Sequence, residues 1–405
     1  MEDIHKLFLE AVACGLKSEY VAWDCDTCPR DWAGFFALAE EHRVLPLVYQ
    51  AVYRCEGFSA ADPELKRRCR AQSMHLAALQ IRCTDAFSAI ADSLTAAGVR
   101  FLVVKGIVLR GLYPNPDLRL SGDEDLLVHP DDMELCCQTL EKLGYTTSDP
   151  QSPDYELPFS NPRSPLRLEV HRSLFPPEQE AYGGWNRLFP DVFSRSLLQD
   201  GIPTLDPADH MLYLICHTFK HFLHSGFGIR QVCDMMLFAN RWGSRMDWLR
   251  LLECCRSIRA EKFAAALFRI GWKHLGFSPE QAGYPIQWQA VYTDEAPLLN
   301  DILNAGVYGK SQQDRVHSSN VTLQAVADQN KGAIRSSLVG SLFPGRKALE
   351  RKYPYLRRWP ILLPFAWASR ILRYAAGRSD ASAALRLGQE RLVLLEKYGI
   401  LNDNL

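Results

Sequence analysis

Apolar residues in the first quarter of the chain recur at the spacing of a helix face. The clearest stripe steps by four, four, three and four residues through Leu79, Cys83, Phe87, Ile90 and Leu94. Upstream, Asp62-Pro63-Glu64 combines an acidic cap with a proline at the first helical position. Gly98 is suited to end this helix, because glycine readily adopts the left-handed conformation of a C-terminal cap. The pattern predicts a helical region up to residue 97.

The pattern then changes from helical to strand-like. Phe101–Val104 is a β-branched and aromatic run that stops at Gly106, and it predicts a short buried strand. After a turn rich in proline and asparagine, a second strand signal covers Leu120–Val128. This strand carries Asp123 and Asp125. Because side chains alternate across a strand, both carboxylates are expected on one face.

A later stretch supplies a third carboxylate. In Leu166–His171, three apolar residues alternate with three polar ones, so one face of a strand is apolar and the other presents Glu169. If this strand lies beside the first, Glu169 converges with Asp123 and Asp125. Carboxylate oxygens are the ligands that Mg²⁺ prefers, and such a cluster can hold the ion against phosphate oxygens.

Helix signals flank the strand region on both sides. Pro130-Asp131-Asp132 opens a helix that reaches Leu143, Tyr145–Thr147 follows as a short strand, and strong cap chemistry from Asp206 onward opens a run of helices. We therefore predict a mixed α+β fold. Its parts are an N-terminal helical region over 1–97, a mixed-sheet core over 98–200 and a larger C-terminal helical domain over 201–405.

The order of the short motifs resembles a known family. Lys105-Gly106 is followed by Tyr113-Pro114, Arg119, the Asp-x-Asp run Asp123–Val128 and Glu169-Val170-His171. This order is similar to that of the bacterial uncharacterised nucleotidyltransferases, within the nucleotidyltransferase superfamily of the DNA polymerase β type. The resemblance implies a nucleotidyltransferase-type mixed sheet with a glycine turn beside the Asp-x-Asp strand.

The resemblance also implies roles for six residues. Asp123, Asp125 and Glu169 would be the catalytic residues and the ligands of two Mg²⁺ ions. Lys105, Gly106 and Arg119 would bind the nucleotide phosphates. The implied reaction moves an NMP group from an NTP, with ATP as the expected donor, to a small-molecule, peptide or protein acceptor and releases pyrophosphate. These motifs do not identify the acceptor.

Two residues depart from the family pattern. The turn glycine normally precedes Ser or Gly, whereas Ile107 follows Gly106, so a hydroxyl that would touch the triphosphate is absent. Lys105 is placed to supply charge instead. Glu124 stands between the aspartates, where an apolar residue is usual, and strand alternation turns it toward the opposite face of the sheet.

Other functions could use the same fold. A non-catalytic scaffold or binding module could retain the fold after losing NTP affinity through the Ile107 departure, although three clustered acids repel one another without a metal. A phosphoryl or pyrophosphoryl transferase could use the same metal site, and the sequence does not distinguish it from a nucleotidyltransferase. The N-terminal helices could be a platform for the acceptor, but a packing support for the sheet is favoured.

Composition and charge narrow the partners and the compartment. A formal net charge of −1 over 405 residues gives no global attraction for long nucleic acid, so none is expected. The first residues lack the basic and apolar segments of a secretory signal, which predicts a cytoplasmic protein. The 12 cysteines, including the lone Cys25-x-x-Cys28 motif, are then expected to be reduced thiols without zinc or redox function.

Two patterns in the C-terminal half allow more than one interpretation. His217, His221 and His224 share a helix face at a spacing that suits zinc, but no acidic ligand is close in sequence, so a polar face toward the cleft is favoured. Between residues 346 and 391, 11 Lys or Arg face three acids around the apolar Ile361–Trp367. This segment could lie on an anionic membrane surface, although helix packing with the basic residues turned outward is favoured.

Overall fold

The centre of the molecule is a six-stranded mixed sheet with the strand order β3-β4-β2-β1-β6-β5. The computed structural model describes residues 2–148, 154–224 and 226–305 and parts of the chain between 322 and 401. The strands are β1 (Phe101–Val103), β2 (Glu124–Val128), β3 (Glu156–Ser160), β4 (Arg167–His171), β5 (Leu197–Gln199) and β6 (Ile202–Thr204). The predicted mixed-sheet core is thereby confirmed.

The strand pairing places the two predicted acidic strands side by side. β2 is antiparallel to β1, with Leu102 opposite Leu127, and parallel to β4, with Asp125 opposite Glu169. β1 also pairs with β6 in the parallel sense. The sheet therefore has its acidic strands next to each other at its centre and a hairpin at each edge.

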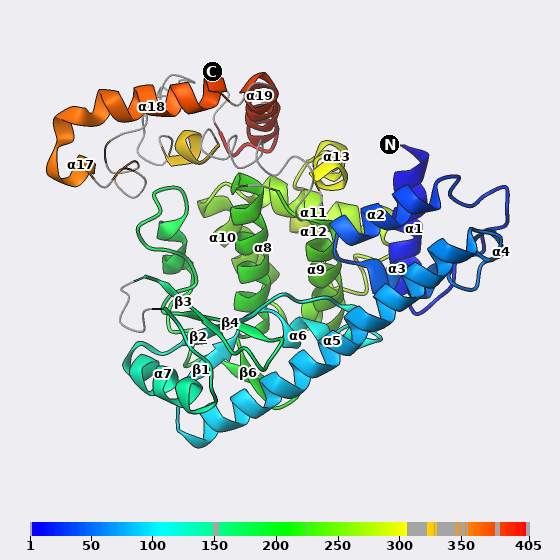
Figure 1. The fold of residues 1–405 in the computed structure, drawn as a ribbon, viewed down its shortest axis with the longest axis horizontal. Helices are drawn as coiled ribbons and strands as arrows, with labels where there is room; N and C mark the ends of the chain where they lie inside the picture. Colours follow the sequence, from blue (N-terminus) through cyan, green and yellow to red (C-terminus); the bar gives the residue numbers. More distant parts are fainter. Residues whose placement is uncertain are drawn as a thin grey trace.

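The N-terminal region is helical, as predicted. It contains α1 (Asp3–Leu16), α2 (Trp32–Glu41), α3 (Leu45–Val52), α4 (Glu56–Ser59) and the 34-residue α5 (Pro63–Ala96). The Asp62 side chain accepts from the Leu65 amide at 2.8 Å and caps α5. Gly98 follows the helix with φ +79° and ends it. In Figure 1, α5 runs from the N-terminal helices to the sheet.

One face of the sheet packs against α5 and α7 (Met133–Lys142). The helices contribute Phe87, Ile90, Leu94, Cys136 and Leu140, and the strands contribute Phe101, Val103, Leu126, Val128, Leu168 and Val170. The stripe expected for α5 and the apolar face expected for the later strand therefore meet in one core. This core fixes which face of β2 and β4 is left for the polar residues.

The opposite face lies against α8 (Pro207–His224) and α9 (Ile229–Trp242), which stand over the sheet in Figure 1. His210 Nε2 lies 2.9 Å from the Val104 carbonyl and fixes the start of α8 on β1. Around these two helices pack α10 (Trp248–Ser257), α11 (Glu261–His274), α12 (Ile286–Gln289) and α13 (Ala296–Ala305).

The N-terminal helices belong to this second core as well. Side chains of α1, α2 and α3 join the same apolar cluster as α8, α9 and α11. His42, which follows α2, accepts from the Ile229 amide through Nδ1 at 3.1 Å, and this hydrogen bond satisfies the first N–H of α9. The N-terminal helices thus support the C-terminal helices, and α5 extends this support to the sheet.

Three local features differ from the sequence prediction. β2 begins at Glu124 instead of near Leu120, because α6 (Ile107–Arg110) and the short helix η1 (Pro116–Leu118) occupy much of the connection from β1. Residues Tyr145–Thr147 form only an isolated bridge, between Thr146 and Ser160. The β5–β6 hairpin was not predicted, and β6 extends the sheet past residue 200.

The C-terminal segment contains α17 (Tyr355–Arg358), η5 (Pro360–Leu362), α18 (Leu363–Ala376) and α19 (Ala381–Lys397). Leu362, Leu363 and Trp367 pack partly against a small apolar cluster, whereas Ile361 and Phe365 are 82% and 70% exposed. Within the part of the chain that the structure describes, no helix has the length and apolarity needed to cross a membrane. All 12 cysteines are free thiols, as predicted.

Candidate active site

The pairing of β2 with β4 assembles a cluster of possible metal ligands. One ligand atom from each of Asp125, Glu169 and His171 lies within 4.8 Å of the other two. Asp125 and His171 are buried, and Glu169 is partly exposed. Among the described residues, these three have the geometry of a metal site. Cys25-x-x-Cys28 and the histidine face of α8 do not form a second such cluster there. The zinc interpretations of those two motifs therefore gain no support.

Both carboxylate oxygens of Asp125 have cationic or polar neighbours. His171 Nε2 lies 3.0 Å from Oδ1, and Lys105 Nζ lies 2.9 Å from Oδ2. Burial opposes ionisation of Asp125, but the charge of Lys105 and the hydrogen bond from His171 hold its pKa well below the usual range. Asp125 is therefore an anion in the metal-free protein.

Glu169 has the opposite electrostatic environment. Burial and the negative charges of Asp125 and Asp123 raise its pKa to about 8. Glu169 therefore holds a proton at neutral pH when no metal is bound. Because Asp123 contributes to this raised pKa, Asp123 lies within electrostatic range of Glu169.

This raised pKa predicts a pH-dependent affinity for divalent cations. The cation must displace the Glu169 proton below pH 8, so the apparent affinity should rise by about tenfold per pH unit up to about pH 8 and then level off. Titration with Mn²⁺ followed by electron paramagnetic resonance would measure it. Glu169→Gln should flatten the profile, and an affinity in the wild type that is flat from about pH 6 to pH 8 would contradict the assignment.

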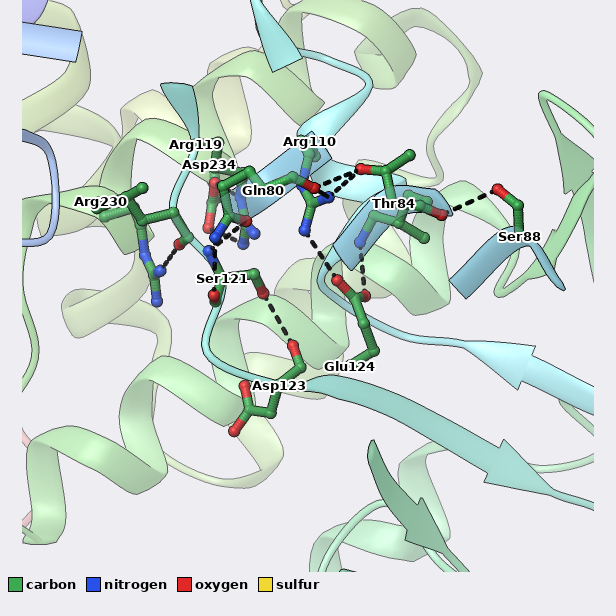
Figure 2. A network of polar contacts seen from close by, with 12 residues as sticks. Gln80, Thr84, Ser88, Arg110, Arg119, Ser121, Asp123, Glu124, Arg230 and Asp234 are labelled. Carbon is green, nitrogen blue, oxygen red and sulfur yellow. Dashed lines mark hydrogen bonds and ion pairs between the residues drawn. The ribbon is translucent and has the colours of Figure 1, made fainter. Parts of the chain in front are cut away.

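Asp123 lies just before β2 and lines a cavity together with Asp125. It is partly exposed. Its backbone carbonyl accepts from Ser121 Oγ at 2.8 Å, whereas its carboxylate has no hydrogen bond or ion pair to any described residue. Figure 2 shows this carboxylate directed away from the neighbouring arginines. Asp123 is thus free to bind a ligand in the cavity, although it is not part of the three-residue cluster.

Glu124 faces the other side of the sheet, as strand alternation predicted. Its Oε2 accepts from the Ile107 amide at 2.7 Å and its Oε1 lies 3.1 Å from Arg110 Nη2 (Figure 2). Gly106 has φ +62°, and a Cβ atom there would lie 1.6 Å from Glu124 Oε2. Glycine is therefore required at this turn for both conformation and space. Glu124 thus joins the glycine turn to β2, the strand that carries Asp125.

Arg119 forms a buried ion pair with Asp234, which its predicted role did not include. Its Nε and Nη2 each lie 2.8 Å from an oxygen of Asp234, and Tyr113 donates to the same carboxylate at 2.8 Å. All three groups are buried. The remaining nitrogen, Nη1, is buried with no hydrogen-bond partner in the described structure. Arg119 lines the cavity, but Asp234 holds its guanidinium, so the binding of a phosphate by Arg119 stays a prediction.

The loop that carries Asp123 is held from two sides (Figure 2). On one side, Gln80 of α5 accepts from the Ser121 amide at 3.1 Å and donates to the Ser121 carbonyl at 3.2 Å. On the other, Arg230 of α9 donates to the Leu120 carbonyl. These contacts come from elements far apart in sequence, and they fix the backbone immediately before Asp123.

The cavity lies between the glycine turn and the helices α8 and α9. It has a volume of about 170 Å³. The sheet side contributes Lys105, Gly106, Arg119, Ser121, Asp123 and Asp125, and the helix side contributes His217, Thr218, His221, Arg230, Gln231 and Asp234 among others. The polar interpretation of the histidine face is therefore the one that the structure matches, for His217 and His221.

Sequence reasoning missed several polar groups near this cavity. Arg230 and Gln231 line it from α9, and Lys220 on α8 lies close enough to Lys105 and Asp125 for their charges to act on it. Isolated basic residues on helices carry no motif that marks them. One available signal was position, since Lys220 lies between His217 and His221.

The residues present fit a hard divalent cation. Asp125 and Glu169 offer carboxylate oxygens at one place, Asp123 lines the adjoining cavity, and His171 holds Asp125 by a hydrogen bond in the manner of an outer-shell residue. The buried Asp125 Oδ2 accepts no well-aligned hydrogen bond, and its neighbour is the ammonium of Lys105. The ammonium of Lys105 therefore occupies the position beside Asp125 Oδ2 where a metal ion would bind.

The chain belongs to a family described as uncharacterised nucleotidyltransferase, which matches residues 29–274. The match runs from the N-terminal helices through the sheet and the cavity to α11. It confirms the family resemblance and places the protein among the transferases of phosphorus-containing groups. No curated protein and no solved structure matches the chain.

Proposed function

We propose that the protein is a Mg²⁺-dependent nucleotidyltransferase that moves an NMP group from an NTP, with ATP the expected donor, to a small-molecule, peptide or protein acceptor. Pyrophosphate is the second product. The proposal depends above all on the parallel pairing of β2 and β4, which brings Asp125 beside Glu169 next to the cavity lined by Lys105 and Gly106.

Different side chains of the site would have different roles in such a reaction. Asp123, Asp125 and Glu169 would hold two Mg²⁺ ions. When bound, such ions neutralise the triphosphate and lower the pKa of an acceptor hydroxyl. His171 orients Asp125, and Lys105 and Arg119 would hold phosphate charge. Glu169 would complete the second metal site or serve as the base that accepts the acceptor proton.

The size of the cavity limits which part of the nucleotide it holds. Its volume of about 170 Å³ is below the range of about 300 to 1,000 Å³ common for small-molecule sites. We infer that the triphosphate occupies the cavity between the acids and the cationic side chains. The nucleoside and the acceptor would then extend beyond it.

The test is to follow each phosphate of the donor separately. Purified protein is incubated with Mg²⁺, a cell lysate and an NTP labelled at either the α or the γ phosphate. Transfer of the α label to an acceptor, with the γ label released as pyrophosphate, is the expected result. Asp125→Asn should abolish the transfer, and Asp85→Asn, an exposed aspartate on α5, is the matched control.

The other outcomes identify the alternative functions. A γ label on the acceptor without the α label would indicate phosphoryl or pyrophosphoryl transfer at the same site. No transfer above the level of Asp125→Asn with either label and any NTP would favour the non-catalytic scaffold. Repulsion among the three acids is only a weak argument against the scaffold, because the ammonium of Lys105 neutralises the charge of Asp125.

A further inference from the structure

We infer that His217 is a positioning residue that docks the ammonium of Lys105 onto Asp125, so that Lys105 and a divalent cation compete for one carboxylate. A nucleotide phosphate would end this competition, because the ammonium of Lys105 could pair with the phosphate instead of with Asp125. The inference deepens the proposed function and rests on it for the nucleotide step. It also assigns a role to a histidine of the α8 face.

The contacts of Lys105 define the docking. Its Nζ lies 2.9 Å from Asp125 Oδ2 and 3.0 Å from His217 Nε2. The Lys105 side chain is 18% exposed. Since His171 lies on the other oxygen of Asp125, both oxygens are engaged before any metal binds.

The hydrogen-bond chemistry fixes the role of His217. An ammonium has only hydrogens to donate, so Nε2 of His217 must accept from Lys105. His221 Nε2 lies 3.2 Å from the same nitrogen, whose single lone pair is already directed at the shorter contact with Lys105. Burial and the charge of Lys105 hold the pKa of His217 well below its usual range, which keeps its ring neutral and able to accept. His217 therefore acts on Lys105 and not as a metal ligand.

Competition for Asp125 couples the binding of the metal ion to the binding of the nucleotide. A metal ion alone must displace the ammonium and leave it facing only the neutral His217. When a nucleotide is present, its phosphates offer the ammonium a new anionic partner within reach of a flexible four-carbon stem. Metal and nucleotide should therefore bind with positive coupling.

The experiment measures binding of Mn²⁺ alone by electron paramagnetic resonance, at pH 8.5 under argon so that Glu169 is ionised. Lys105→Met should tighten Mn²⁺ binding by at least about tenfold, because it removes both the competitor and its charge. Lys220→Met is the matched control. Lys220 lies near the same acids but forms no ion pair with any described residue, so its removal should change the affinity by less than about threefold. Equal effects, or no gain in Lys105→Met, would overturn the inference.

Variants of His217 separate positioning from metal ligation. His217→Leu should tighten Mn²⁺ binding in the wild-type background and have no further effect in Lys105→Met, because it acts through Lys105. His217→Gln keeps an acceptor and should restore wild-type affinity. Weaker binding in His217→Leu in both backgrounds would make the ring a ligand and overturn the inference.

Two further measurements protect the test against misfolding and against failure of the proposed function. Lys105→Met leaves Asp125 uncovered, so Mn²⁺ should raise its melting temperature more than that of the wild type, and Lys105→Gln should repeat the result. Equal increases in melting temperature in the wild type and in Lys105→Met would contradict the competition.

The metal titrations are independent of the proposed function. Because they use metal without nucleotide, the competition between Lys105 and the metal can hold even if no label is transferred. With α,β-methylene-ATP, the coupling should be present in the wild type and lost in Lys105→Met.

Discussion

Asp125→Asn is expected to lower the rate of α-label transfer by at least about a thousandfold. Asp125 is the most buried acid of the candidate metal site, where it contacts Lys105 and His171 and lies beside Glu169. Replacing its charge removes the ligand that a metal ion needs most. Initial rates at saturating NTP and Mg²⁺ provide the measurement, and turnover within about tenfold of the wild type would refute the metal assignment.

The stability changes should separate Asp125 from Glu169. Repulsion among the acids alone predicts that removing either one stabilises the metal-free protein. Asp125 is paired with Lys105, so Asp125→Asn leaves a largely buried ammonium without its anion and should cost about 1 to 3 kcal/mol. Glu169→Gln removes a group whose pKa is raised by burial and by the other acids, so it should not lower stability. A similar loss in both variants would contradict this electrostatic description.

Local sequence patterns predicted the framework of this site well. Strand alternation placed Glu124 on the face opposite the aspartates, and the alternation in Leu166–His171 predicted β4 and its acidic face. The cap at Asp62 and the stripe along α5 likewise depend only on near neighbours in the chain. Such features are determined by backbone geometry that the sequence encodes over a few residues.

The features that sequence reasoning missed depend mostly on contacts between distant segments. Arg119 was predicted to bind phosphate, and its pairing with Asp234, 115 residues away in the sequence, was not predicted. The docking of Lys105 on His217 spans 112 residues. No local pattern specifies such pairs, because they arise when α8 and α9 pack over the sheet.

One missed element did have a local signal. β5 and β6 are joined through Asp200-Gly201, and both residues have positive φ, 51° and 84°. An Asp-Gly pair between two short strands is typical of a tight hairpin turn. The strands are only three residues long, and β6 contains Pro203, so their own residues gave little indication of a strand.

The largest stability effect is expected for Asp234→Ala. The variant would leave the buried Arg119 guanidinium without its carboxylate and the Tyr113 hydroxyl without its acceptor. Removing one partner of a buried ion pair typically costs about 3 to 5 kcal/mol, because the other charge stays buried and unpaired. Urea unfolding at constant m-value would measure the loss.

Two controls identify the cause of that loss. Replacing both partners, in Asp234→Ala with Arg119→Met, should recover much of the stability, because no charge is then left unpaired. Asp131→Ala removes an exposed carboxylate 3.3 Å from Arg100 and should leave the urea midpoint unchanged within error. The single and double variants should also bind Mn²⁺ more weakly than the wild type, because Arg119 anchors the loop that carries Asp123 to α9. If Asp234→Ala shifted the midpoint no more than Asp131→Ala, the buried pair would have no role in holding that loop.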